Sequence, residues 1–107
     1  MPILQINFKL NVPAEEYASS CQGVAQAIAS VAGLRWKIWI LNEQEKEAGG
    51  IYLFDTERSL SDYLSGPIVA QLRKHPGLRD ATVKRFDVME DLTSTTPDPV
   101  SHMAATQ

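Results

Sequence analysis

The chain has little of the material from which many structural and catalytic sites are built. Its 107 residues include one cysteine, Cys21, and two histidines, His75 and His102. A single cysteine excludes an internal disulfide and a cysteine-rich metal cluster. Two histidines without a neighbouring group of carboxylates do not make a set of metal ligands, so we expect no bound metal.

Several widespread catalytic motifs are also absent. The sequence contains no G-x-S-x-G, H-E-x-x-H, C-x-x-C or G-x-G-x-x-G pattern. The pair Gly49-Gly50 is not a phosphate loop, because it opens a strand and does not join a strand to a helix. It indicates a bulge or a place where bulky neighbours need room. Alternatively, the missing side chains open the floor of a ligand cavity.

The chain has neither a basic surplus nor a long apolar run. Ten Lys and Arg stand against thirteen Asp and Glu, and the net charge is −3. This balance gives no basic footprint for nucleic acid. No stretch of about 18 apolar residues is available to span a membrane, and the N-terminus lacks the pattern of a signal peptide. We therefore expect a cytoplasmic protein that binds neither nucleic acid nor membrane.

What the sequence does contain is a pair of strands, within residues 33–56, that are apolar on both faces. Side chains alternate across a strand, so a sheet wetted on one side shows apolar and polar residues in turn. Here the apolar residues are Trp36, Ile38 and Ile40 against Trp39 and Leu41, then Ile51 and Leu53 against Tyr52 and Phe54. The charged loop between the strands, residues 42–47, is interpreted as a solvated hairpin tip, and a binding patch is the minor alternative. Something apolar must cover each face.

The segment before this hairpin predicts a strand and a helix. Residues 3–10 alternate as a strand with one apolar face. A helix is predicted to begin near Pro13 and to stop at Gly33. Its apolar stripe consists of Tyr17, Cys21, Val24, Ile28 and Val31. On this stripe Cys21 is a small buried hydrophobe in preference to a nucleophile.

The segment after the hairpin predicts a broken helix and a last strand. Asp55 or Thr56 caps the helix, which is interrupted at Gly66-Pro67 and ends near His75. His75 suits capping of the negative helix end or simple exposure, and acid–base chemistry is the alternative. The apolar positions are Leu60, Tyr63 and Leu64 before the break and Ile68, Val69 and Leu72 after it. Residues 82–88 form the fourth strand.

The order β-α-β-β-α-β predicts a ferredoxin-like α+β fold, with a four-stranded antiparallel sheet and the helices on one face. We assign residues 1–92 to this domain. The polar, proline-interrupted residues 93–107 form a C-terminal tail or an arm ordered against a partner. A chain of this size buries roughly 60–70% of its surface, so it cannot easily cover a second face. The remaining apolar face predicts a twofold homodimer in which sheet packs on sheet.

Three segments, GLRWKIW, EAGGIYLFDTERS and VKRFDVMEDL, resemble the YdhR-type monooxygenases of the dimeric α/β-barrel superfamily. The resemblance extends over residues 3–92 and is most specific in EAGGIYLF. It implies a ferredoxin-like protomer that pairs through its sheets into a barrel. It also implies a monooxygenase that oxidises a small aromatic or quinone-like compound without metal, flavin or haem.

Aromatic and polar side chains on the strands make up the candidate site. The aromatic rings fit core and dimer packing, but they also fit a small-molecule pocket with a few convergent polar groups. The substrate-binding candidates are Trp36, Trp39 and Phe54, and the catalytic candidates are Asn7, Lys37, Tyr52 and Arg85. Lys37 or Arg85 would stabilise a substrate anion, and Asn7 or Tyr52 would orient a substrate oxygen.

Trp36 and Trp39 are predicted to face opposite sides of the sheet, because they are three positions apart along a strand. We expect one at the dimer seam and the other toward the helices, with the ligand cavity on the helix side and its mouth at Gly66-Pro67. The alternative to a monooxygenase is a non-catalytic protein of the same fold that binds a small apolar metabolite, as in a stress response. A lyase or isomerase is the third reading.

Overall fold

A four-stranded antiparallel sheet organises the protein, whose computed structural model describes residues 1–97. The strands are β1 (Pro2–Leu10), β2 (Leu34–Asn42), β3 (Glu47–Phe54) and β4 (Leu78–Asp87). The helices of the described residues are α1 (Ala14–Ala29), α2 (Glu57–Leu64), α3 (Pro67–Lys74) and α4 (Glu90–Thr95).

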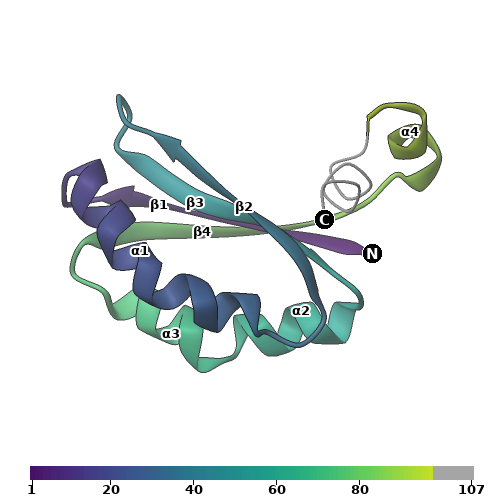
Figure 1. The fold of residues 1–107 in the computed structure, drawn as a ribbon, viewed down its shortest axis with the longest axis horizontal. Coiled ribbons are helices and arrows are strands. Elements are labelled where there is room, and N and C mark those ends of the chain that lie inside the picture. The colour runs from purple at the N-terminus through teal and green to yellow at the C-terminus, as the bar shows by residue number, and fades with distance from the viewer. Residues whose placement is uncertain (98–107) are drawn as a thin grey trace.

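The strands lie side by side in the order β2-β3-β1-β4. Helices α1, α2 and α3 lie along one face of this sheet, whereas α4 lies beyond the end of the sheet and away from them (Figure 1). This is the ferredoxin-like β-α-β-β-α-β arrangement that the sequence predicts. The sheet therefore has a helix-covered face and an open face.

The core lies between the sheet and the three covering helices. In β1 every second side chain, from Leu4 to Leu10, is buried against the helices. The other core residues are Ala48, Tyr52 and Phe54 from β3 and Ile28, Leu60, Tyr63 and Val69 from the helices. Leu53 is also buried, although it pairs with Trp36 and Ile3 on the open face. Some cover therefore exists on the open face near the start of β1.

Helix α1 begins where the sequence predicts but ends earlier. It starts after Pro13, and the acidic residues of its first turn favour the positive end of the helix dipole. It ends at Ala29, so the predicted stop at Gly33 is wrong. Gly33 lies in the following turn with a φ of +81°, and a Cβ there would collide with the side chain of Ser59. Its role is to let the turn approach α2, a tertiary contact that the local pattern does not reveal.

The interrupted helix appears as predicted. Thr56 caps α2, since its Oγ1 accepts a hydrogen bond from the backbone N–H of Ser59 at 3.1 Å. The chain then breaks at Gly66, and α3 starts with Pro67 at its first position. The break separates two short helices of eight residues each.

The last elements of the described chain differ from the predicted ones. β4 begins at Leu78 and not at residue 82, because Leu78 pairs with Leu10 beyond a register shift. The sequence pattern does not predict α4, which spans the expected boundary between residues 92 and 93. An ion pair of 3.8 Å joins Glu90 of α4 to the amino group of Met1. Residues 98–107 of the predicted tail, with His102, lie outside the described residues.

Candidate functional site

The two faces of the sheet divide the predicted site residues between them. The strand register places Lys37, Trp39, Tyr52, Phe54 and Arg85 on the helix-covered face and Asn7 and Trp36 on the open face. Lys37 pairs directly with Tyr52, whereas Trp36 pairs with Leu53. The two tryptophans therefore face opposite sides of the sheet, as predicted.

Lys37 is a cation held over two aromatic rings. Its Nζ lies 3.2 Å from the centre of the Trp39 ring and 4.7 Å from the centre of the Tyr52 ring. Among residues 1–97 no carboxylate lies within ion-pair distance of this amine. The ring faces favour the charged amine, but burial outweighs them and lowers the pKa of Lys37 to about 8. Lys37 can therefore exchange a proton close to physiological pH.

The glycine pair of β3 leaves the space that the side chain of Lys37 occupies. A Cβ on Gly50 would lie 2.5 Å from Cε of Lys37, and a Cβ on Gly49 would collide with the backbone of Ile6. The register between β1 and β3 runs past both glycines without a shift. The pair therefore provides room for close neighbours, and the alternative of a bulge is wrong.

Tyr63 of α2 connects Tyr52 to the helices. Its hydroxyl donates a hydrogen bond to the hydroxyl of Tyr52 at 3.1 Å, and the two ring centres are 5.1 Å apart. Burial raises the pKa of both phenols, so both are neutral across the physiological range. Because the Tyr52 oxygen accepts the Tyr63 proton, Tyr52 keeps its own proton for another acceptor.

Two of the small pockets on the helix side bear on the predicted site. The first has a volume of about 220 Å³, and Tyr63, Gly66 and Pro67 are part of its lining. The second, of about 130 Å³, lies between α1 and α3, with Tyr17 and Cys21 in its lining. The first pocket occupies the break at which the sequence predicts a cavity mouth. Cys21 is half-buried beside Tyr17, so it lies at a pocket wall and not in the closed core.

Two other candidates on this face are engaged elsewhere. Arg85 pairs with Glu57 at 3.2 Å and donates to the hydroxyl of Ser61 at 3.3 Å, which compensates its charge at the outer strand β4. Phe54 is completely buried and, like Tyr52, lines neither of these two pockets. Its ring packs against Tyr63 with the centres 5.6 Å apart. Arg85 is therefore held by α2, and Phe54 belongs to the core.

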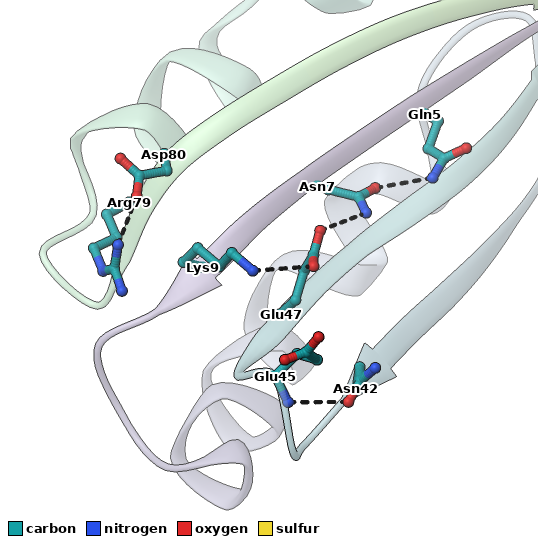
Figure 2. Close-up of polar contacts among 8 residues, drawn as sticks. All are labelled: Gln5, Asn7, Lys9, Asn42, Glu45, Glu47, Arg79 and Asp80. Atoms are coloured by element: carbon teal, nitrogen blue, oxygen red, sulfur yellow. Dashed lines mark hydrogen bonds and ion pairs between the residues drawn. The ribbon is translucent and has the colours of Figure 1, made fainter.

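Asn7 belongs to a polar ladder on the open face (Figure 2). Its amide donates to Oε2 of Glu47 at 3.0 Å and accepts from Gln5 at 3.2 Å. Lys9 completes the ladder with a bond of 3.2 Å to Oε1 of Glu47. The bonds from Asn7 and then Lys9 lower the pKa of Glu47. The structure therefore separates Asn7 from Lys37 by the thickness of the sheet.

Trp36 lies at the other end of the open face, beside a larger cleft. The cleft has a volume of about 670 Å³ and lies between the start of the sheet and the segment that contains α4. Ile3, Trp36 and Leu53 contribute from the sheet, and Met89 and Leu92 contribute from the α4 segment. Sequence reasoning placed the cavity on the helix side and missed this cleft, because no local pattern predicts α4.

The structure thus brings together Lys37, Trp39 and Tyr52 and leaves Asn7 and Trp36 on the opposite face. The sequence analysis omitted Tyr63 from the candidate site. Its place in the helical stripe with Leu60 and Leu64 predicts an inward orientation. The pairing of its hydroxyl with that of Tyr52 depends on the packing of α2 against β3, which no spacing reveals.

Neither a metal site nor a membrane span is found within residues 1–97. No group of three His, Cys, Asp or Glu side chains among them is arranged to hold a metal ion. No helix in this part of the chain is long and apolar enough to cross a membrane. The groups gathered around Lys37 are therefore its own amine, the neutral phenols of Tyr52 and Tyr63 and the indole ring of Trp39.

Comparison with protein families gives one match, which covers most of the chain. The model described as "Putative mono-oxygenase ydhR" matches residues 3–99. The match extends past residue 92, where the sequence resemblance ended, and includes α4. A comparison with curated proteins finds no match.

Several solved structures have a similar fold. One is SnoaB, a cofactor-independent oxygenase from Streptomyces nogalater, with a TM-score of 0.64 and 15% identity over 82% of this chain and 93% of that chain. Another is the monooxygenase ActVA-Orf6 of Streptomyces coelicolor in complex with nanaomycin D, with a TM-score of 0.63 and 17% identity over 81% and 86%. A third is the haem-degrading protein MhuD of Mycobacterium tuberculosis with two haems bound, with a TM-score of 0.63 and 17% identity over 81% and 95%. At these identities the likeness shows a common fold.

Proposed function

Because this chain belongs to the YdhR mono-oxygenase family, we propose that it is a cofactor-independent monooxygenase that oxidises a small phenol or hydroquinone. The observation that carries this proposal is Lys37, an amine with a pKa of about 8 that lies over two aromatic rings. A phenol becomes reactive toward dioxygen only as its electron-rich anion. A neutral lysine beside a flat aromatic surface is suited to generate that anion and to hold it.

The overall reaction balances without an added reductant. A phenol with a free ring position loses its O–H and one ring C–H proton, and that ring carbon gains one atom of dioxygen as a carbonyl oxygen. The second oxygen atom leaves as water with the two protons. The four electrons that dioxygen accepts come from the substrate, which is oxidised to a quinone. The protein therefore has only to remove a proton, stabilise the anion and exclude bulk water.

Each residue of the helix-covered site has a separate task in this scheme. Neutral Lys37 takes the phenolic proton and then faces the phenolate as an ammonium ion. The Trp39 ring, which is 40% exposed, stacks against the substrate ring. Tyr52 is 1% exposed and its hydroxyl oxygen already accepts from Tyr63, so its free proton reaches a substrate oxygen only when the two short helices separate.

The pocket at the break between α2 and α3 is the proposed entrance. Its volume of about 220 Å³ accommodates a single ring but lies below the roughly 300–1,000 Å³ usual for small-molecule sites. A two-ring substrate therefore requires the two short helices to separate at Gly66. Tyr63 lies both in the pocket lining and against Tyr52, so it would guide a substrate from the entrance toward Lys37.

The proposed assembly is a homodimer in which the open faces of two sheets pack together. The open face carries Ile38 and Phe86, which are 37% and 48% exposed, in addition to the polar ladder. With a twofold axis the same surface of each subunit forms the interface, so every contact between two residues occurs twice. Such a pairing leaves the helix-covered site of each subunit at the outside of the dimer.

A non-catalytic binding protein is the second candidate, and one observation favours it. Within residues 1–97 Lys37 has neither a carboxylate nor an imidazole within ion-pair distance to relay its proton. A protein that only holds an apolar aromatic molecule needs no such relay. Saturable binding of a phenol without oxygen consumption would select this function.

Oxygen uptake by the purified protein with a panel of phenols and hydroquinones tests the proposal. We expect uptake with at least one compound, together with the appearance of a quinone spectrum. The absorption spectrum of the protein alone should show no visible band, and a flavin or haem band would refute cofactor independence. A Lys74→Met variant is the matched control for Lys37→Met, because Lys74 is exposed at the end of α3.

A further inference from the structure

The amine of Lys37 can be reached from solvent, although its side chain is half-buried. Within residues 1–97 the Trp36 indole nitrogen is the one side-chain nitrogen or oxygen that is both buried and unpaired. The Lys37 amine also makes no hydrogen bond and no ion pair with these residues. It would share the description of the indole nitrogen if it were sealed from water. The amine therefore keeps an accessible surface at which a small molecule can contact it.

An aromatic surface lies directly beside this amine. The Nζ atom is 3.2 Å from the centre of the Trp39 ring and 4.7 Å from the centre of the Tyr52 ring. Trp39 belongs to β2, which is the outer strand of the sheet, and its side chain is 40% exposed. Part of its ring is therefore open to a ligand. A flat aromatic molecule that stacks on this ring is brought next to the lysine nitrogen.

The titratable groups near the amine favour its neutral form. Tyr52 is a neutral phenol with a raised pKa, and the effect of Cys21 on the pKa of Lys37 is smaller than that of burial, which lowers it. A neutral amine has a free lone pair, and a desolvated lysine of this kind is suited to form a Schiff base with a carbonyl compound. The resulting imine needs no counter-charge, unlike an ammonium ion in the same place.

We propose that Lys37 captures small aromatic aldehydes as a reversible Schiff base beside the Trp39 ring. The lone pair of the amine attacks the aldehyde carbon, and the carbinolamine that forms then loses water. The C=O bond and two N–H bonds break, a C=N bond forms, and the oxygen leaves with the two amine protons. No oxidant or reductant takes part. Lys37 acts here as a nucleophile and not as a base, so the inference does not depend on the proposed oxygenase reaction.

Reductive trapping in the absence of dioxygen tests this inference. The protein is incubated at about pH 7 with benzaldehyde and sodium cyanoborohydride, which reduces an imine to a stable benzylamine. Peptide mass mapping then locates the benzyl group and separates an adduct on Lys37 from one on the amino group of Met1. Lys74, which is exposed at the end of α3, is the internal control.

We expect Lys37 to be labelled at least about tenfold faster than Lys74, because an ordinary lysine is almost fully protonated at this pH. Equal labelling of the two lysines would overturn the proposal. Oxygen uptake with a phenol by a protein whose Lys37 is not trapped would overturn this inference alone. Trapping at Lys37 in a protein that consumes no oxygen with any phenol would support this inference and contradict the oxygenase.

A second aldehyde tests the preference for an aromatic ring. Cyclohexanecarbaldehyde has a ring of the same size without aromatic faces, and the labelling of Lys74 in the same sample corrects for the intrinsic reactivity of each aldehyde. The labelling of Lys37 relative to Lys74 should be about threefold greater with benzaldehyde, and Trp39→Leu should abolish this difference. Equal relative labelling by the two aldehydes in the unsubstituted protein would overturn the proposal. If Trp39→Leu fails to fold, the comparison of the two aldehydes on the unsubstituted protein decides alone.

Discussion

The two faces of the sheet are built from the same alternating strands but present different chemistry. On the helix-covered face, apolar rows and three helices surround one amine, Lys37, that has no counter-charge within the described part of the chain. On the open face, each of the polar groups around Glu47 is paired, and the unpaired group is a neutral donor, Trp36. Burial lowers the pKa of the Lys37 amine, whereas the Trp36 indole stays a neutral donor. From this difference we propose that proton chemistry belongs to the covered face and assembly to the open face.

The sharpest difference between the faces should appear when Lys37 is replaced by methionine. A positioned general base contributes about 10²–10⁴ in rate, so we expect Lys37→Met to lower kcat/KM for a phenol by at least about 100-fold. The Lys74→Met control should retain the activity of the unsubstituted chain. Steady-state oxygen uptake measures both. Loss of activity in both variants would show that the effect is not specific to the covered face.

Assembly should respond to charge on the open face and not on the covered one. Ile38→Asp places an unpaired carboxylate in the proposed dimer seam, and we expect the dimer to dissociate at least about tenfold more readily. Leu41→Asp is the matched control, because Leu41 lies on the same strand but on the other face, and it is 48% exposed against 37% for Ile38. Sedimentation equilibrium at micromolar concentration gives the two dissociation constants. A chain that is a folded monomer before any substitution would contradict the assembly outright.

The buried amine should also make stability depend on pH. The pKa of Lys37 is about 8 in the folded chain and 10.5 when unperturbed, so between these values the unfolded chain binds more protons. The contribution of Lys37 to the free energy of unfolding therefore rises as pH increases from about 8 to 10.5. Below pH 8 the charged amine lowers stability, and we expect Lys37→Met to be more stable there by about 1–2 kcal/mol, discounted for partial exposure.

Urea unfolding of both proteins at pH 7 and at pH 10.5 measures this contribution. The difference between the two proteins should shrink at the higher pH. Both proteins contain the buried tyrosines, whose raised pKa values lower stability at high pH. Their contribution to the free energy of unfolding therefore cancels in the difference. A difference that stays constant across the range would show that Lys37 is not desolvated.

The polar ladder should give the smallest effect and the opposite pH dependence. Hydrogen bonds from Asn7 and Lys9 lower the pKa of Glu47 below 4.5, so Glu47 adds stability above that value. This contribution is lost as pH falls through the lowered pKa. We expect Glu47→Gln to reduce the urea midpoint slightly at pH 7 and not at pH 3. An equal reduction at both values would mean that the charge of Glu47 is irrelevant to the ladder.

The sequence alone predicted the architecture of the described residues better than the site. Alternation in β1, the stripe of α1 and the break at Gly66-Pro67 are local patterns with a single period, and the structure follows them. The opposite orientation of Trp36 and Trp39 follows from the period of a strand in the same way. These features depend on neighbours in sequence and therefore leave a readable signal.

The missed features depend on neighbours in space. The missing side chain of Gly50 leaves room for Lys37 on the neighbouring strand, and the hydroxyl of Tyr63 bonds to that of Tyr52 across the core. Asn7 was grouped with Lys37 because both are polar strand residues, although the register of β1 and β3 sets them on opposite faces. Helix α4, which lies beside the cleft at Trp36, contains Leu92 as its one large apolar residue and so shows no apolar period. Which polar groups share a face becomes known only when the register is known.

The most direct test of the proton chemistry assigned to the covered face is the pH dependence of kcat/KM for a hydroquinone, measured with the unsubstituted protein and with Lys37→Met as the blank for uncatalysed oxidation. The proposed role of Lys37 predicts an enzymatic rate that rises through an apparent pKa of about 8 and levels off as the amine becomes neutral. Lys37→Met should lack this limb and follow the uncatalysed rate. A profile with the same limb in both proteins would contradict the assignment of the base to Lys37.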